Sequence, residues 1–241
     1  MISRRFQLLS CLAALAIALP AVAQRLPLRL MINDVAPYSW HRDEALVGMH
    51  VELMKALAEQ AEMDLELRSG AYARLIRGLQ DGWADGVLVL RGADFDQQAR
   101  WVGRLHSFRS VVISRRAAPI AAVPELKGKL LGMARGAFYS DAINNDEEIR
   151  KFGLTDPFQG VRMLAVGRLD AVISSDYLLA YALRQTGLDV NQFAPRFVVN
   201  ELSYDLYMRR DYPEPAFQRL RQALEQIERR GRLAAILKTY E

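Results

Sequence analysis

Apolar and polar positions follow one another along the first half of the chain in a regular order. Short apolar runs predict strands at 28–32, 65–67 and 86–90. Between them, apolar residues at helical spacing predict helices over 51–61 and 75–79. The run 86–90 is apolar throughout, which is typical of a strand covered on both faces. This alternation of strands and helices predicts parallel strands joined by right-handed crossovers.

A short pattern that joins a helix to a strand occurs twice. Residues 79–89 and residues 164–174 both contain L-x-x-G-x-x-D, followed by glycine or alanine and then by valine. Each copy predicts a helix that ends at a glycine in the left-handed conformation, then a turn and a buried strand. Two copies indicate two α/β lobes of similar build.

The second half of the chain predicts further elements of both kinds. Extended segments are expected at 111–115, 129–133, 196–199 and 204–208, and helices at 138–152, 217–227 and 233–237. The sequence contains no low-complexity linker between the lobes. We therefore expect strands, such as 111–115 and 204–209, to cross from one lobe to the other.

The N-terminal residues 1–23 have the pattern of a secretory signal peptide. Two arginines precede an apolar run over 8–19, and an A-x-A motif ends at Ala23. The run is shorter than the roughly 20 apolar residues that span a bilayer. We predict cleavage after Ala23 and a periplasmic protein.

The composition narrows the class of protein. Hydrophobic residues make up 51% and charged residues 25%, which excludes a disordered chain and a polytopic membrane protein. The formal net charge is +4, but cleavage would remove two arginines and the one cysteine, Cys11. A basic segment interleaved with aromatic residues is absent from the rest of the sequence. We therefore expect neither nucleic-acid binding nor thiol chemistry.

Six stretches, in order along the chain, carry a resemblance to a known family. They are 36–39 (APYS), 48–54 (GMHVELM), 79–89, 124–132 (PELKGKLLG), 167–172 (GRLDAV) and 231–240 (GRLAAILKTY). With them the chain resembles the family 3 extracellular solute-binding proteins of ABC transporters, which have the type II periplasmic-binding-protein fold. The resemblance implies two α/β lobes, each a mostly parallel sheet flanked by helices, joined by two crossing strands.

This resemblance also implies a domain division and a function. Lobe 1 would comprise residues 24–111 and 208–241, and lobe 2 residues 112–207. A monomer would hold a small solute in the cleft between the lobes, close by hinge bending and deliver the solute to an ABC permease. The resemblance implies no cofactor, no metal and no catalytic residue.

The chain departs from the amino-acid binders of this family at several positions. They carry an arginine for the ligand carboxylate after the third strand, where this chain has Gln97. They carry an aspartate for the amino group where this chain has Ser175, although a shift of one residue would restore Asp176. Further departures are Ala137, in place of a threonine, and Leu90 with Arg91, in place of a polar strand end. These departures argue against an ordinary α-amino acid as the ligand.

The expected ends of the strands contain aromatic and cationic residues. Tyr38, Trp40 and Tyr72 offer ring faces to a flat or apolar ligand, or serve only to pack the lobes. Arginine can grip a carboxylate with two parallel hydrogen bonds. The expected cleft residues also include Arg74, Arg91 and Arg135, and Gly136, Ala137 and Phe138 at an expected helix start whose N–H groups suit an anion. This set predicts a small, anionic organic or amino-acid-like solute.

Two other functions stay open. Some relatives with this fold are exported cyclohexadienyl dehydratases, and His41, Glu44 or Asp176 could then serve as a proton donor. A ligand-binding sensor or adaptor protein is the other alternative. His41, His50 and His106 have no metal-ligand spacing, so we expect them to be surface or hydrogen-bonded structural residues.

Overall fold

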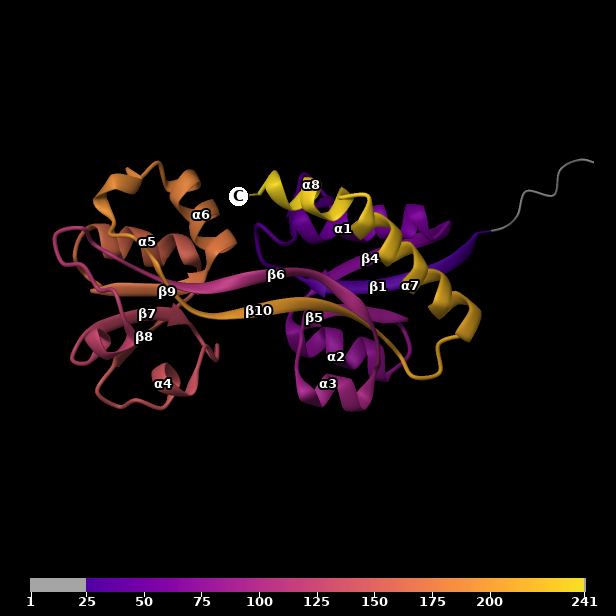
Figure 1. Cartoon of the computed structure of the whole chain (residues 1–241), viewed down its shortest axis with the longest axis horizontal. Coiled ribbons are helices and arrows are strands. Elements are labelled where there is room, and N and C mark those ends of the chain that lie inside the picture. Colours follow the sequence, from indigo (N-terminus) through magenta and orange to yellow (C-terminus); the bar gives the residue numbers. More distant parts are fainter. Residues whose placement is uncertain (1–24, 241) are drawn as a thin grey trace, which may run out of the picture.

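The computed structural model describes residues 25–240, except for the side chains of residues 93 and 94, so the predicted signal peptide lies outside the described residues. Its main sheet contains eight strands: β1 (Leu26–Asn33), β4 (Met63–Gly70), β5 (Gly86–Leu90), β6 (Arg100–Ser114), β7 (Leu130–Ala134), β8 (Arg150–Leu154), β9 (Ala171–Ser175) and β10 (Phe197–Met208). Their order is β4-β1-β5-β10-β6-β9-β7-β8. The long antiparallel strands β6 and β10 run through the whole molecule and join its two lobes (Figure 1).

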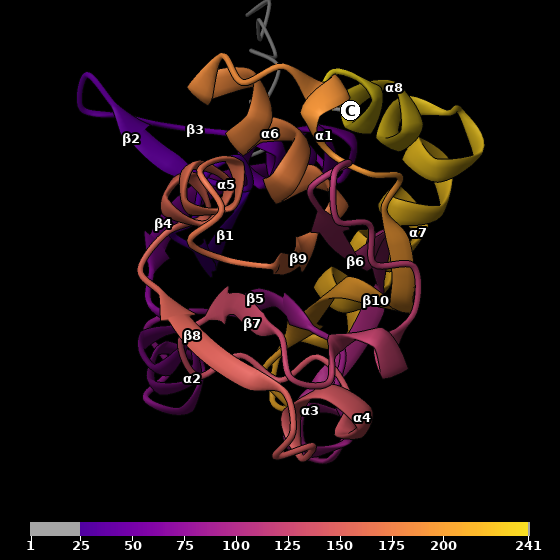
Figure 2. The same cartoon turned by 90° about the vertical axis from the view of Figure 1, so that its left-hand side faces the viewer.

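Lobe 1 contains the parallel strands β1, β4 and β5. Its other elements are α1 (Met49–Gln60), α2 (Tyr72–Gln80), α3 (Ala93–Gln98), α7 (Glu214–Arg229), α8 (Arg232–Lys238) and the hairpin of β2 (Trp40–Arg42) and β3 (Ala45–Val47). Helices α1, α7 and α8 cover one face of the sheet, and α2 and α3 cover the other (Figure 1). The hairpin projects from the body of the molecule (Figure 2).

Lobe 2 contains the parallel strands β7, β8 and β9. Its helices are α4 (Asp141–Asn144), α5 (Pro157–Ala165) and α6 (Asp176–Thr186), with 3₁₀ turns at Val123–Leu126 and Val190–Gln192. The predicted α/β fold with a mostly parallel sheet is therefore confirmed. The predicted lobe boundaries near residues 111 and 207 fall inside the strands β6 and β10, which run from one lobe into the other. These boundaries therefore stay a prediction.

The repeated pattern forms the same structure in both lobes. Gly82 and Gly167 have φ angles of 74° and 75°, in the left-handed region where glycine is favoured. The carboxylate of Asp85 accepts the backbone N–H of Arg29 in β1 at 3.0 Å. The carboxylate of Asp170 accepts the backbone N–H of Leu130 in β7 at 2.7 Å. Each copy thus attaches the turn after a helix to the start of the lobe's first parallel strand.

Two predicted elements differ from the structure. The helix expected over 138–152 is wrong, because α4 has four residues and β8 occupies 150–154. The side chain of Asn144 explains the difference, since its oxygen accepts the N–H groups of Tyr139 and Ser140 and its nitrogen donates to the Ala137 carbonyl. Such side-chain bonds to the backbone compete with a longer helix. The two strands expected at 196–199 and 204–208 are one strand, β10.

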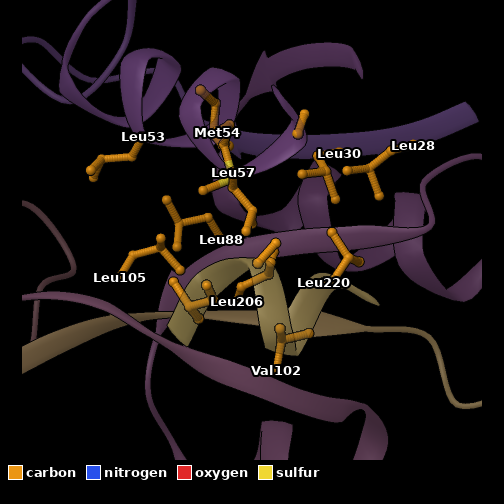
Figure 3. Packing of buried hydrophobic residues seen from close by; sticks show 14 of the residues in the cluster. Leu28, Leu30, Leu53, Met54, Leu57, Leu88, Val102, Leu105, Leu206 and Leu220 are labelled. Atoms are coloured by element: carbon orange, nitrogen blue, oxygen red, sulfur yellow. The ribbon is translucent and has the colours of Figure 1, made fainter. Parts of the chain in front are cut away.

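The largest hydrophobic core lies in lobe 1 between the sheet and helices α1 and α7. Figure 3 shows Leu53, Met54 and Leu57 of α1 packed above Leu88 and Leu206 of the sheet. Lobe 2 has separate clusters on the two faces of its sheet. Within residues 25–240, each helix is too short or too polar to cross a membrane.

Candidate functional site

Tyr38 joins the two lobes. It lies in the loop after β1, is 2% exposed, and its hydroxyl donates to Ser175 Oγ at 2.8 Å. Ser175 is the residue before α6, and its oxygen also accepts the N–H of Leu178 at 3.1 Å. Two residues that the sequence places in opposite walls of a cleft are therefore in direct contact.

The N-terminus of α1 holds the Tyr38 loop in place. The N–H groups of Met49 and His50 donate to the carbonyls of Pro37 and Tyr38 at 3.0 and 2.8 Å. Gly48 precedes the helix with a φ of 125°, and a Cβ there would lie 2.5 Å from the Tyr38 carbonyl oxygen. Only glycine fits this close approach of two backbone segments.

Two buried histidines lie behind Tyr38, and we call them the histidine pair. The Nε2 atoms of His50, in α1, and His106, in β6, are 2.9 Å apart. Tyr38 stacks on His50 with ring centroids 4.7 Å apart, and Tyr204 stacks on His106 at 5.3 Å. The ring of Tyr177, from lobe 2, is almost perpendicular to that of His106, with ring centroids 5.8 Å apart.

Burial sets the charge of the histidine pair. Desolvation lowers the pKa of His50 well below its usual value and lowers the pKa of His106 to about 4. Both rings are then neutral at pH 7, and one Nε2–H donates to the lone pair of the other Nε2. These two are therefore hydrogen-bonded structural histidines, as the sequence predicts. The sequence does not predict that they bond to each other, because they are 56 positions apart.

Helix α6 makes further contacts with lobe 1 and the crossing strands. The Asp176 carboxylate accepts from Arg109 Nε of β6 at 3.0 Å, so this predicted ligand residue already has a cationic partner. The Trp40 ring lies 5.8 Å from that of Tyr181. The Arg184 guanidinium donates to the Tyr240 carbonyl at 2.9 Å.

A small cavity lies between the loop after β1 and lobe 2. Its volume is about 180 Å³. Val35 lines it from lobe 1, and Ala134, Leu154, Asp156 and Ser174 are among the residues that line it from lobe 2. Asp156 caps α5, because its carboxylate accepts the N–H of Gln159 at 2.8 Å. This interlobe cavity is mostly apolar.

Large apolar side chains are exposed where the parallel strands end. Val35 follows β1 and Tyr72 follows β4, with 43% and 50% of their surface exposed. Leu90 ends β5 and Phe138 follows β7, at 37% and 63%. Tyr72 also contacts Phe95 of α3, with ring centroids 6.4 Å apart. In open α/β sheets ligands bind outside these strand ends, so the exposed apolar surface lies where a solute would contact it.

The three predicted arginines do not converge on one point. Arg74 lies over the end of β4, because a Cβ on Gly70 would be 3.0 Å from its Cδ. Arg91 lies 3.9 Å from the buried carboxylate of Asp205, in β10, and 3.8 Å from that of Asp96, in α3. It also lies over the ring of Trp101, at 5.3 Å from the centroid. Arg91 therefore already has carboxylate partners.

Arg135 and its neighbours do not form an anion site at a helix start. The Arg135 side chain runs along Gly153 of β8. Gly136, with a φ of 75°, lies in a turn in which the Ala137 N–H donates to the Ala134 carbonyl at 3.1 Å. The expected helix after Gly136 does not begin until Asp141, so it supplies no N–H groups there.

The remaining candidates lie elsewhere. Gln97 is in α3, where its carbonyl accepts a hydrogen bond from Arg210. His41 is exposed in β2, and Glu44 is exposed in the β2–β3 turn, with a φ of 66°. Within residues 25–240, groups of three or more His, Cys, Asp and Glu side chains that could hold a metal ion are absent.

The family is decided by a match over almost the whole described chain. The family model for bacterial extracellular solute-binding proteins, family 3, matches residues 28–241. The chain belongs to this family. It is 20% identical over 210 residues to the probable amino-acid-binding protein YxeM of Bacillus subtilis strain 168, with 85% of this chain and 79% of YxeM covered. It is 24% identical over 217 residues to the arginine-binding extracellular protein ArtP of the same strain, with 86% and 82% covered.

Several solved structures share this fold. A histidine kinase sensor domain similar to periplasmic binding proteins matches with a TM-score of 0.73 and 19% identity, covering 90% of this chain and 96% of the sensor domain. An ancestral arginine-binding protein bound to arginine matches with a TM-score of 0.71 and 17% identity, covering 90% and 99%. These likenesses confirm the two-lobed type II periplasmic-binding-protein fold.

Proposed function

We propose that this family 3 protein captures a small organic, amino-acid-like solute between its lobes and delivers it to an ABC permease. The observation that carries the proposal is the direct contact of the Tyr38 hydroxyl with Ser175 across the lobes, beside exposed apolar side chains at the strand ends. The relatives YxeM and ArtP are named as amino-acid-binding and arginine-binding proteins, which supports a solute of this class.

The cleft favours a solute with an apolar body and one anionic group. Tyr72, Leu90 and Phe138 present apolar surface at the strand ends, and their contact with a ligand would remove that surface from water. Of the two predicted arginines near strand ends of lobe 1, Arg91 has carboxylate partners, whereas Arg74 has none among residues 25–240. We therefore assign to Arg74 the contact with a ligand carboxylate.

Closure would strengthen this contact. Opposite charges interact more strongly when the lobes exclude water, because the effective dielectric constant falls. The hydrogen bond from the Tyr38 hydroxyl to Ser175 would then hold the two lobes together. The predicted signal peptide and the family's extracellular location support a periplasmic place for this protein, where we propose that it meets the permease as a monomer.

A thermal-shift screen of metabolites tests the proposal. We expect amino acids and related carboxylates with apolar side chains to raise the melting temperature, since a ligand at 100 times its Kd adds about 2.7 kcal/mol to the free energy of unfolding. If every amino acid, organic acid and amine in the screen leaves the melting temperature unchanged, solute capture is wrong. Incubation with prephenate and arogenate, followed by product analysis, tests the dehydratase alternative.

A pair of variants of α2 tests the role of Arg74. Arg74→Ala should weaken binding of the best ligand by about 10-fold to 100-fold, the range for loss of a charged hydrogen bond. Arg77→Ala, an exposed arginine one turn along the same helix, is the matched control and should leave the affinity unchanged. Equal affinities of the two variants by calorimetry would remove Arg74 from the binding site.

A further inference from the structure

Lobe 2 contains a second cavity, which the proposed function does not use. It lies between α6 and residues 190–196, the segment that leads into β10, and has a volume of about 380 Å³. Leu179 and Leu183 of α6 and Ile113 and Phe193 contribute to its walls. Residues assigned above to the solute cleft do not line it.

Arginines surround this apolar cavity. Arg116, Arg184 and Arg196 all line it. The Arg116 guanidinium donates to the Asn191 carbonyl at 2.7 Å, and one such bond leaves further N–H donors on the side chain. Arg196 makes none of the side-chain hydrogen bonds or ion pairs found among residues 25–240. The residues that line the cavity include no aspartate or glutamate.

A smaller cavity of about 200 Å³ adjoins the first and shares Ala180 and Arg196 with it. Arg109, Asp176 and Tyr177 also line this smaller cavity. The Asp176 carboxylate is paired with Arg109, so it does not neutralise Arg196. Together the two cavities form one apolar groove along α6 with an excess of positive charge, which we call the α6 groove.

We propose that the α6 groove binds a small amphiphilic carboxylate, separately from the solute between the lobes. Ligand sites are concave and mostly apolar, with a few polar groups that fix the orientation of the ligand. Here the alkyl chain would lie against Leu179, Leu183 and Phe193, and the carboxylate would bind Arg196. A cationic head group would meet an excess of like charge, because the one carboxylate of the groove, Asp176, is already paired with Arg109.

Straight-chain carboxylates test this assignment by calorimetry with the full chain. Hexanoate, heptanoate and octanoate should bind about fourfold more tightly for each added methylene, the increment for burial of one CH₂. Octanol should bind more weakly than octanoate by about 10-fold, and octylamine should not bind. Equal affinities for octanoate and octanol would overturn the role of the arginines, and equal affinities for the three acids would overturn burial of the chain.

Variants locate the octanoate. Arg196→Ser should weaken octanoate binding by about 10-fold, whereas Arg162→Ser, at an exposed arginine of α5, should leave it unchanged. Ala180→Trp places a ring where the two cavities meet and should abolish binding. Octanoate that binds both the Arg196 and the Ala180 variants as tightly as the parent protein overturns the proposal.

The cleft variant separates this proposal from the proposed function. Arg74→Ala should leave octanoate binding unchanged, because Arg74 does not line the α6 groove. If octanoate binding falls with Arg74→Ala and not with Arg196→Ser, octanoate is a ligand of the cleft and the groove proposal is wrong, whereas solute capture stands.

Discussion

The two lobes use the same helix-to-strand connection, but they surround its carboxylate differently. In lobe 1 Asp85 bonds to the backbone of β1 and also contacts two cations, Arg29 at 2.7 Å and Arg209 at 3.5 Å. In lobe 2 Asp170 bonds to the N–H of Leu130, and no ion pair is found for it among the described residues. One sequence pattern therefore specifies the backbone geometry in both lobes, while the charges around it are set by residues far away in the chain.

The three histidines are also distributed unequally between the two lobes. All three are in the part of the sequence before residue 107, and two of them, His50 of α1 and His106 of β6, form the buried pair. Lobe 2 contains no histidine within its predicted range, 112–207. Titration of the buried histidine pair should therefore act on the stability of lobe 1 and not on a group within lobe 2.

Lowering the pH should have the largest effect on stability, through the two buried histidines of lobe 1. Burial lowers the pKa values of His50 and His106. Below pH 6.5 the unfolded chain therefore binds more protons than the folded chain, and the free energy of unfolding decreases as the pH is lowered. Each histidine contributes a slope of up to about 1.4 kcal/mol per pH unit, and together they should remove about 2–4 kcal/mol between pH 6.5 and 5. Urea unfolding at a series of pH values measures the slope.

The control for this experiment removes one histidine at a time. His106→Asn should reduce the slope by about one proton, whereas His41→Asn, at an exposed histidine in the β2–β3 hairpin, should reduce it little. The interpretation fails if the slope between pH 6.5 and 5 is the same in the parent protein and in His106→Asn.

The two aspartates should give the next largest difference. Asp85→Ala leaves Arg29 and Arg209 without their shared carboxylate, and we expect a loss of about 2–4 kcal/mol in the free energy of unfolding. Asp170→Ala removes one bond to a backbone N–H and should cost about 1–2 kcal/mol. Chemical denaturation compares the variants, and an equal loss in both would show that the arginines add nothing in lobe 1.

The two glycines should give the smallest difference. An alanine at Gly82 or Gly167 would adopt a left-handed conformation, which costs about 1 kcal/mol. A Cβ at Gly82 meets no atom within 4 Å, but at Gly167 it would lie 2.5 Å from Nη1 of Arg115. Thermal unfolding should therefore rank Gly167→Ala as the less stable variant, and the reverse order would contradict this reading of the two turns.

The sequence predicted those parts of the fold that depend on local pattern. The strands 28–32 and 86–90 and the turns at Gly82 and Gly167 were all found from apolar runs and one repeated motif. The helix expected over 138–152 was wrong because the side chain of Asn144 bonds to the backbone of the preceding turn, which periodicity does not reveal. Local pattern also missed residues 100–110 of β6, where polar and apolar positions do not alternate strictly.

The candidate site was less predictable, because it depends on which distant residues the fold brings together. Tyr38 and Ser175 were named separately, and only the structure reveals their 2.8 Å contact. Arg91 resembled a free cleft cation, but Asp205, which is 114 positions later and wholly buried, already pairs with it at 3.9 Å. The histidine pair and the α6 groove gave no signal in the sequence, since the two histidines lie 56 positions apart and the groove is lined by several separate segments.

The place of β10 in the sheet has a consequence for the order in which the protein can fold. Residues 204–208 of β10 lie between β5 and β6, two strands that the chain contains about 100 positions earlier. The sheet of lobe 1 cannot be completed on a growing chain until residues 112–207 have been synthesised. The N-terminal lobe is then the last to finish, and the chain stays incompletely folded until its final helices, α7 and α8, arrive.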